Sequence, residues 1–452
     1  MKIKKLLLKN FRCFEDFEID FNTGDENHGG LTVLVAKNGE GKTAILDAIN
    51  VAWGPFIGKM PKITGASFTD DDITKRKGIK LGILRLYAEF ADENMHESNM
   101  FLSEPGFSIS RELTTAKNKA TTTIKDAKML TNLALYLFQH EQENMPWPIL
   151  AYYGDSRLWA AGRVTENKKE ALLNRERAYG YLYATNPQAG YREFEQWYAD
   201  LSNNIWLKER QRQKNSLLFE QEKLDWFNLL NSIIDKSLKL AMEVTGWTKL
   251  EYDGGDKQIM AFNEKTGDIV PWTSLSAGNR IVIGLVADIA HRCCILNPWA
   301  KEMALKQTPG IVLIDEIELH LHPSWQQQIL PTLQRIFPQI QFIVTTHSPQ
   351  VVSAVPKECV RIIDDGKVVP FFTQTQGVES QDILAEIFGT SPSPQDDEYV
   401  KMLNQYARME VEGKADTDEG KLIYASLANH YGKSYPPLMQ IQIHKEFANR
   451  KK

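Results

Sequence analysis

The pattern of hydrophobic and polar positions predicts two kinds of β-strand. Apolar and polar residues alternate twice within residues 1–22, which predicts two strands that each bury one face. The run "GIVLIDE" at 310–316 instead holds four apolar residues in succession, as in a strand of a parallel sheet buried on both faces. Further alternating strands are expected at 81–90, 107–115 and 121–125, and further buried strands at 31–36, 147–154 and 341–348.

Helices are predicted between these strands. One runs from Lys42 to Trp53 after a glycine-containing turn, and another covers 275–296 after a second tight turn. Residues 157–245 are rich in Glu, Arg, Gln, Leu and aromatic residues, which predicts an inserted helical region with helices near 190–210 and 213–243. We also expect helices at 127–141 and 323–336, a loop with a basic tip at 54–80, a hairpin at 248–262 around "DGGDK", and a tail broken by Ser and Pro after 373.

Composition narrows the class of protein. The chain has 452 residues, of which 42% are hydrophobic and 25% charged, and its formal net charge of −5 gives no overall basic signal for nucleic acid. Its four cysteines form no C-x-x-C pair, so neither a zinc site nor a disulfide framework is expected. No stretch has the length of a membrane span or of a signal-peptide core, so we expect a cytoplasmic protein without membrane contact.

The stretch "AKNGEGKT" at 36–43 carries the first chemical signal. It lies between a predicted strand and a predicted helix, where backbone N–H groups of 37–43 can surround a phosphate. Lys42 would reach the β- and γ-phosphates, and the Thr43 hydroxyl would bind Mg²⁺. Ala36 stands where the phosphate-loop pattern has glycine, which is tolerable if its φ is negative. The expected nucleotide-binding residues are Lys37, Asn38, Gly39, Glu40, Gly41, Lys42, Thr43 and Ala44.

Three further segments would complete a hydrolytic site. Asp315 and Glu316 end a buried strand, where Asp315 can hold Mg²⁺ and Glu316 can polarise the attacking water. His347 ends another strand and is a candidate sensor of the γ-phosphate. The turn "LSAGNR" opens a helix and can bind an anion through its N–H groups. Its candidate residues are Ser276, Ala277, Gly278, Asn279 and Arg280.

These four segments, in their order along the chain, resemble the ATP-binding-cassette (ABC) ATPases. "LSAGNR" is similar to the cassette signature usually written LSGGQ, and His347 matches the switch histidine. The resemblance implies that ATP is held between two head-to-tail copies, in a homodimer or a higher even-numbered homo-oligomer. One copy would supply the phosphate loop with Asp315 and Glu316, and the other would supply Ser276 and Gly278. The departures are Ala36, Ala277 and the pair Asn279-Arg280.

Other stretches point to one branch of these ATPases. About 230 residues separate the phosphate loop from the signature. This is too few for the long coiled coil of the chromosome-maintenance proteins. The opening "LLLKNFRCFEDFEIDF" resembles RecF-type and OLD-type ATPases, which implies that Arg12 lies near the nucleotide; a surface ion pair is the alternative. The segment from "DEIELHLHP" to "TTHSP" resembles the bacterial AAA15/AAA21 group. "LAYYGDSRLW" (150–159) and "GVESQDILAEIFGT" (377–390) resemble ATPase subunits of Septu-type and retron-linked anti-phage systems.

The resemblance implies an α/β fold: an ABC-type head with a mixed β-sheet core, an antiparallel β-subdomain and an inserted helical region. We expect the phosphate-loop half of the head at 1–156 and the helical insertion at 157–247. The half with the signature, the Walker B strand and the switch histidine would cover 248–373. A helical tail at 374–452 is a possible partner-binding segment.

Three functions remain open on the sequence. The first is an ATPase with ATP and Mg²⁺ that gates a separate nuclease, suspected to be of the HNH type, in anti-phage defence; the chain lacks the carboxylate cluster of the nuclease domain in OLD-type proteins. The second is a RecF-like repair ATPase, and the third a transporter subunit. The basic stretches 74–80 and 207–214 either contact nucleic acid or form solvated surfaces. Phe194, Trp197 and Tyr198 suit packing or base stacking. His320 and His322 lack a third ligand for a metal site, and the resemblance implies that they belong to a dimer-contact loop.

Overall fold

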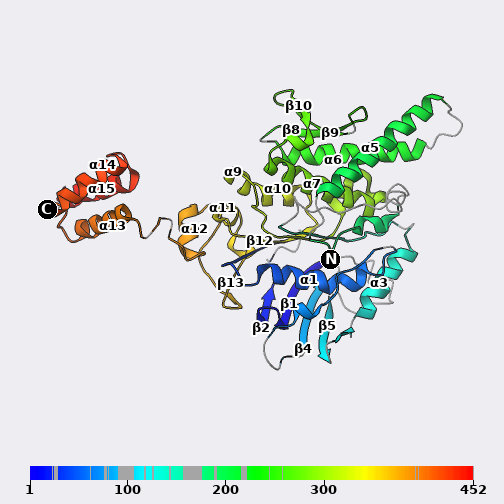
Figure 1. The fold of residues 1–452 in the computed structure, drawn as a ribbon, viewed down its shortest axis with the longest axis horizontal. Coiled ribbons are helices and arrows are strands. Elements are labelled where there is room, and N and C mark those ends of the chain that lie inside the picture. Colours follow the sequence, from blue (N-terminus) through cyan, green and yellow to red (C-terminus); the bar gives the residue numbers. More distant parts are fainter. Residues whose placement is uncertain are drawn as a thin grey trace. The chain divides into compact units, whose positions relative to one another are not determined.

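The chain divides into two compact units, residues 1–379 and 380–452, which are considered separately. Figure 1 shows their helices and strands in a computed structural model. The structure describes residues 1–452 except 23, 25–28, 62, 76–78, 80, 90–105, 117–118, 125–126, 142–143, 156–175, 188–190, 215–220, 244, 257, 392, 395 and 451–452.

A six-stranded mixed sheet forms the centre of the first unit. Its strand order is β14-β13-β3-β12-β11-β7; the five strands from β13 to β7 are parallel, and β14 pairs antiparallel with β13. Every residue of β3, β7, β11 and β12 is buried, which confirms the strands predicted from uninterrupted apolar runs. Because these strands are parallel, their carboxyl ends lie at one edge of the sheet. The bounds are β3 Leu31–Ala36, β7 Ile149–Tyr153, β11 Gly310–Ile314, β12 Ile340–Thr346, β13 Val360–Asp364 and β14 Lys367–Val369.

A five-stranded antiparallel sheet with the order β2-β1-β4-β5-β6 lies beside this core. Its strands are β1 Lys2–Phe11, β2 Phe14–Asp20, β4 Leu81–Glu89, β5 Gly106–Ala116 and β6 Lys119–Ile124, and they confirm the alternating strands predicted from the sequence. Helix α1 (Lys42–Ile57) contacts strands of both sheets, and it also packs against α3 (Ala127–Gln139). It extends to Ile57, beyond the predicted end at Trp53, so the following loop is shorter than expected.

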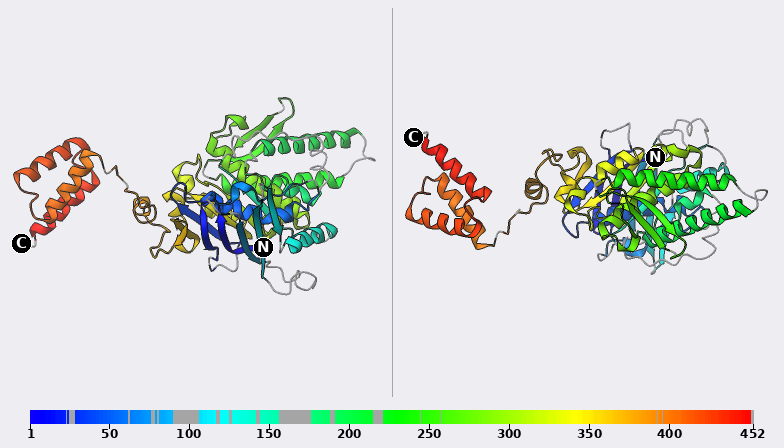
Figure 2. Two further views of the ribbon diagram at one scale, coloured as in Figure 1. Left: turned by 60° about the horizontal axis from the view of Figure 1, so that its bottom comes forward. Right: turned by 90° about the horizontal axis from the view of Figure 1, so that it is seen from above.

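Helices and a small sheet follow β7 along the chain. Helices α5 (Tyr191–Lys214) and α6 (Gln221–Ala241) run side by side in Figures 1 and 2, and α6 packs on α7 (Ala277–Leu296). The predicted hairpin is present as β8 (Trp247–Asp253) and β9 (Gln258–Asn263), and β10 (Ile269–Pro271) completes a three-stranded antiparallel sheet. The predicted mixed α/β fold, with an antiparallel subdomain and a helical insertion, is confirmed.

The predicted continuous helix at 323–336 is wrong. The segment forms α9 (Pro323–Gln326) and α10 (Ile329–Ile336), separated by a turn. The Gln328 N–H bonds to the carbonyl of Trp325, three residues earlier, which tightens the chain and interrupts the helix. Within the described residues of the first unit, the other short helices are η1 Asp70–Asp72, η2 Arg177–Tyr181, η4 Trp272–Ser274, η5 Pro298–Met303, α8 Ala304–Gln307, α11 Pro349–Val352 and η6 Lys357–Cys359.

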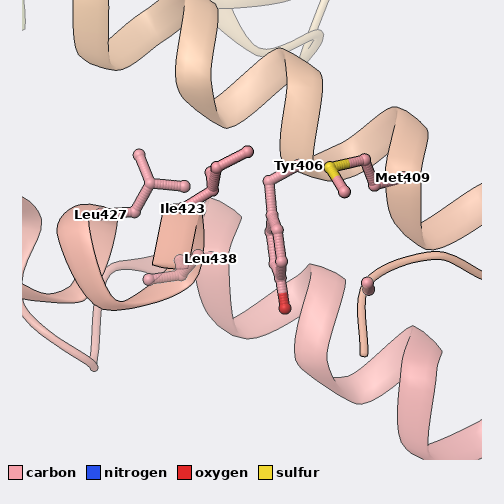
Figure 3. Close-up of a cluster of buried hydrophobic side chains, with 6 residues drawn as sticks. Tyr406, Met409, Ile423, Leu427 and Leu438 are labelled. Atoms are coloured by element: carbon pink, nitrogen blue, oxygen red, sulfur yellow. The ribbon is translucent and has the colours of Figure 1, made fainter. Parts of the chain in front are cut away.

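The second unit is helical and has its own core. It contains α12 Ser380–Glu386, α13 Glu398–Val411, α14 Asp418–Tyr431 and α15 Pro436–Arg450. The Asp397 and Thr417 side chains cap α13 and α14 by accepting backbone N–H groups. Apolar side chains from α13, α14 and α15 meet in the core shown in Figure 3: Tyr406, Met409, Ile423, Leu427 and Leu438. Across the described part of both units, no helix has the length and apolar character needed to cross a membrane.

Candidate functional site

The loop between β3 and α1 has the backbone geometry of a phosphate-binding turn. Gly39 and Gly41 have φ values of 87° and 93°, in the left-handed region that favours glycine. A Cβ atom on Gly41 would also lie 2.5 Å from the Cys13 sulfur, so the segment after β1 closes one side of the loop. Ala36 ends β3 in extended conformation and pairs with Ile363, so its methyl group causes no backbone strain.

Lys42 begins α1, and its side chain is buried against the loop. The ammonium group donates hydrogen bonds to the carbonyls of Ala36 at 3.0 Å and Lys37 at 3.3 Å. Burial lowers the Lys42 pKa, and the nearby Asp315 carboxylate opposes that shift. The first turn of α1 also leaves backbone N–H groups without partners inside the helix. The charge of Lys42 and these N–H groups therefore lie where they can bind a phosphate.

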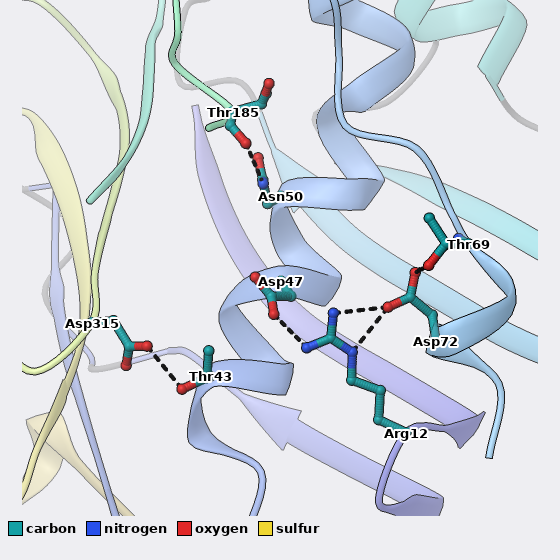
Figure 4. A network of polar contacts seen from close by, with 8 residues as sticks. All are labelled: Arg12, Thr43, Asp47, Asn50, Thr69, Asp72, Thr185 and Asp315. Carbon is teal, nitrogen blue, oxygen red and sulfur yellow. Dashed lines mark hydrogen bonds and ion pairs between the residues drawn. The ribbon is translucent and has the colours of Figure 1, made fainter. Parts of the chain in front are cut away.

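Thr43 and Asp315 join the phosphate loop to the end of β11. The Thr43 hydroxyl donates a hydrogen bond to Asp315 Oδ2 at 2.8 Å, as drawn in Figure 4. Asp315 Oδ1 accepts a second hydrogen bond, from Thr345 at the end of β12, and Asp315 as a whole residue is only 4% exposed. No group of three or more His, Cys, Asp or Glu side chains placed to hold a metal occurs within the described ranges. The Thr43 hydroxyl and the Asp315 carboxylate offer oxygen ligands of the kind that Mg²⁺ shares with phosphate oxygens and water.

Glu316 lies directly after Asp315 in a strained part of the backbone. Its φ is 46°, and its N–H donates to the Thr345 hydroxyl at 2.8 Å. Burial raises the Glu316 pKa, and the neighbouring carboxylates of Glu318 and Asp315 add to the shift. A raised pKa makes a carboxylate a stronger base, which suits removal of a proton from water.

His347 follows β12, and the Glu318 carboxylate binds its backbone. Its backbone N–H donates to Glu318 Oε1 at 2.5 Å, and the Thr346 hydroxyl donates to Glu318 Oε2 at 2.7 Å. Burial, followed by the charge of Lys42, lowers the His347 pKa, so the imidazole is neutral at pH 7. The sequence feature that points to these hydrogen bonds is the pair of threonines, Thr345 and Thr346, at the end of the buried strand before His347.

The signature residues begin α7. The Ser276 hydroxyl accepts the Asn279 N–H at 3.3 Å, which caps the helix, while Ala277 and Arg280 lie in its first turn. A Cβ atom on Gly278 would lie 2.8 Å from the carbonyl oxygen of His320. Glycine at this position therefore lets the signature approach the loop that follows Glu316 in its own chain.

Arg12 is held by two carboxylates. Its Nε and Nη2 atoms lie 2.9 and 2.8 Å from Asp72 Oδ1, and its Nη1 atom pairs with Asp47 of α1 (Figure 4). The structure thus contains the ion pairs that were the alternative to nucleotide contact. The next residue, Cys13, packs on Gly41, so Arg12 still lies one residue from the wall of the phosphate loop.

Several other candidate residues have structural partners. Tyr198 is buried and donates to the Leu250 carbonyl at 2.6 Å, and Trp197 is buried as well, so both pack in the interior. His322 Nδ1 accepts the Ser324 N–H and caps α9, while His320 is exposed. In the basic stretches, Lys75 pairs with Asp71 at 2.7 Å, and Arg210 lies over the Trp206 ring. Arg76, Lys77 and Lys80 lie outside the described residues, as do the side chains of Phe194, Lys208, Arg212 and Lys214.

Comparison with known protein families agrees with this geometry. The sequence model described as "AAA domain" matches residues 5–243, which is more than half of the chain. The chain belongs to this AAA-domain family. A second AAA-domain model, described as "AAA domain, putative AbiEii toxin, Type IV TA system", matches residues 186–353. Together with the relatives described next, these matches identify the AAA-domain protein as an ATPase.

Relatives of this AAA-domain ATPase are similar over most of its length. The "Retron Ec83 probable ATPase" of Escherichia coli is 26% identical, over 98% of this chain and 86% of that protein. The "Retron Vc95 probable ATPase" of Vibrio cholerae is 25% identical, over 95% of this chain and 88% of that protein. The "Septu protein PtuA" of Bacillus mycoides is 24% identical over 77% of this chain, but over only 38% of its own length. The resemblance to retron and Septu ATPases is thus confirmed.

Among solved structures, a crystal structure of an Smc head bound to the C-terminal winged-helix domain of ScpA matches this AAA-domain chain. The TM-score is 0.49 at 17% sequence identity, over 82% of this chain and 98% of that chain.

Proposed function

We propose that the chain binds Mg-ATP at residues 37–44 and hydrolyses it in a site completed by the signature residues of a second copy. The observation that carries this proposal is the hydrogen bond between Thr43 and Asp315. It brings the hydroxyl of the phosphate loop and the Walker B carboxylate to one place, with Glu316 as the next residue. Mg²⁺, when bound there, would neutralise charge on the β- and γ-phosphates.

The chain's own groups then have distinct roles. Lys42 exchanges its hydrogen bonds to two loop carbonyls for hydrogen bonds to phosphate oxygens, so its charge stabilises the transferring phosphoryl group. Glu316 orients the attacking water and accepts its proton. His347, neutral at pH 7, donates a hydrogen bond to the γ-phosphate.

The requirement for a second copy rests on the signature. Ser276 is exposed at the start of α7, a helix of 20 residues, where the N–H groups of the first turn can bind an anion. We propose that this surface meets the nucleotide of the opposite subunit, as the resemblance to ABC ATPases implies. The proposed assembly is therefore a homodimer or a higher even-numbered homo-oligomer.

A mixing experiment tests the shared site. Lys42→Ala subunits lack the phosphate-binding charge, and Ser276→Arg subunits carry a bulky side chain on the signature. Each variant alone should be inactive, whereas an equal mixture should recover part of the wild-type ATPase rate, because one site in a mixed dimer keeps both intact halves. Lys239→Ala, which changes an exposed lysine paired with Glu264, is the control and should retain the full rate. A mixture as inactive as its components would contradict the shared site.

The cellular role that we propose is gating of a separate effector nuclease in anti-phage defence. Its support is the similarity to retron ATPases over 98% and 95% of the chain and to Septu PtuA. Nucleotide-dependent closure of two subunits changes the surface that they offer to a partner, which is how an ATPase can control a second enzyme. The partner in this proposal is a nuclease of the HNH type.

The gating proposal is tested with purified protein and nucleic acid. The chain alone, with ATP and Mg²⁺ or Mn²⁺, should leave plasmid, single-stranded DNA and tRNA intact. Addition of a nuclease encoded by a neighbouring gene should produce cleavage that the Glu316→Gln variant alters. Cleavage by the chain alone that is lost in a point variant of this chain would contradict the proposal.

A RecF-like repair function is the second candidate. The observation in its favour is a match to the "DNA replication and repair protein RecF" of Lactococcus lactis, 44% identical over 50 residues. That match covers 11% of this chain, so it supports a shared motif more than a shared function. Stimulation by the chain of recombinase loading on gapped DNA, without any effect on a nuclease, would favour this candidate.

A further inference from the structure

Glu318 binds two consecutive residues at the end of β12. One carboxylate oxygen accepts the hydroxyl of Thr346 at 2.7 Å, and the other accepts the backbone N–H of His347 at 2.5 Å. The Thr346 hydroxyl also accepts the N–H of Ser348 at 3.0 Å. Glu318, which comes from the segment after β11, thus holds the His347 N–H directly and the Ser348 N–H through the Thr346 hydroxyl.

The local backbone directs Glu318 to this position. Glu316 has a positive φ, and the following Ile317 N–H donates to the Thr345 carbonyl at 3.1 Å. Ile317 is itself buried, which fixes the segment against the sheet. Residues 316–318 therefore run beside the end of β12, and the Glu318 carboxylate reaches the next residues along that strand.

A carboxylate suits this position better than a neutral side chain. The two groups to be bound, an O–H and an N–H, are both donors, and a carboxylate offers two acceptor oxygens where an amide offers one. The charge has a cost, because Asp315 and Glu316 are close, and Glu318 contributes to the raised pKa of Glu316. The need to bind two hydrogen-bond donors does not by itself explain why a third carboxylate stands beside Asp315 and Glu316.

We propose that Glu318 is a positioning residue for ATP hydrolysis, which holds the backbone of His347 so that the imidazole ring meets the γ-phosphate. The inference rests on the proposed role of His347 in the ATPase reaction. It adds a residue that acts on the reaction through His347. Loss of both hydrogen bonds lets the His347 backbone move, and a displacement of about 1 Å from the working geometry can cost about 100-fold in rate.

The test compares Glu318→Ala, Glu318→Gln, His347→Ala and the double variant Glu318→Ala/His347→Ala in the full chain. Glu318→Ala should lower kcat by about 10- to 100-fold and leave the calorimetric Kd for Mg-ATP within about threefold. Glu318→Gln keeps one acceptor oxygen and should recover part of that loss. The double variant should be no slower than His347→Ala, because two residues that act as one unit are not additive. If Glu318→Ala does not fold, Thr346→Val takes its place. This variant removes the hydrogen bond between the Thr346 hydroxyl and Glu318 and should also lower kcat.

The outcomes separate this inference from the one on which it rests. Wild-type kcat in His347→Ala would overturn the role of His347 itself. A slow His347→Ala variant beside an unaffected Glu318→Ala variant would overturn the positioning role alone. Additive losses in the double variant would also overturn it, since Glu318 would then act on the reaction by a route independent of His347.

Discussion

The hydroxyl of Thr43 donates a hydrogen bond to the carboxylate of Asp315 at 2.8 Å, although 272 positions separate the two residues. Thr43 belongs to the first turn of α1, and Asp315 follows β11. Strands β3 and β11 both pair with β12 in parallel, so their carboxyl ends lie at the same edge of the sheet. The register of three buried strands therefore brings together the residues of the proposed nucleotide site.

Replacement of Thr43 tests the Mg²⁺ role of this contact. Thr43→Val keeps the side-chain shape and removes the hydroxyl, so the Mg²⁺ concentration for half-maximal ATPase rate should rise about tenfold or more, because one oxygen ligand is lost. Thr43→Ser keeps the hydroxyl and is the matched control. The ATPase rates of both variants are measured as a function of Mg²⁺ concentration at saturating ATP. Equal Mg²⁺ dependence of Thr43→Val and wild type would remove Thr43 from the metal site.

Glu316→Gln should separate binding from hydrolysis. The amide occupies the same volume but cannot accept a proton from water, so kcat should fall by about 100- to 10,000-fold. The Kd for Mg-ATP, measured by calorimetry, should change by less than about threefold. Glu302→Gln alters an exposed carboxylate and should behave as wild type. Hydrolysis at the normal rate by Glu316→Gln would show that another group activates the water.

Ala36→Gly restores the residue usual at the first position of the phosphate loop and should not improve the site. Ala36 is extended and paired within β3, so no left-handed conformation is required of it. We expect an unchanged Kd for Mg-ATP and a free energy of unfolding lower by about 0.5–1 kcal/mol, because glycine loses more conformational freedom on folding. Calorimetry and urea unfolding measure the two quantities. A clear gain in ATP affinity would mean that the methyl group of Ala36 distorts the loop.

His291 predicts a dependence of stability on pH. Its ring packs 3.5 Å from that of Trp197, and burial lowers the His291 pKa from 6.5 to about 3. A lowered histidine pKa means that the folded state resists protonation, so the contribution to stability is present above pH 6.5 and is lost as the pH falls below it. At pH 5 the loss amounts to about 2 kcal/mol, at 1.36 kcal/mol per pH unit.

The His291→Phe variant isolates this effect from other titrating groups. Phenylalanine keeps an aromatic ring against Trp197 and has no ionisable group. Asp235, whose pKa burial raises to about 6, acts in the opposite direction but is present in both proteins. Between pH 8 and pH 5, the free energy of unfolding of wild type should fall by about 2 kcal/mol more than that of the variant. Parallel pH profiles would contradict the burial of a neutral His291.

The sequence by itself determined the parts of this protein that depend on neighbouring residues. The apolar runs of β3, β11 and β12 are long enough that only burial on both faces satisfies them, so these strands could be predicted. The candidate phosphate loop could be proposed from the sequence because its strand, glycine turn, Lys42 and Thr43 follow one another within a short stretch. Ser276 is a residue type that favours the N-cap of a helix, and it stands directly before α7.

Only the tertiary structure decided which distant residues meet. The partners of Arg12 are Asp47 and Asp72, 35 and 60 positions away, and no local pattern selects these two carboxylates from the many in the chain. The contact of Glu318 with His347 depends on the positive φ of Glu316 and on the parallel pairing of β11 with β12. Such contacts arise from strand register and chain reversal, which sum over the whole fold, so hydrophobic periodicity along one segment carries no information about them.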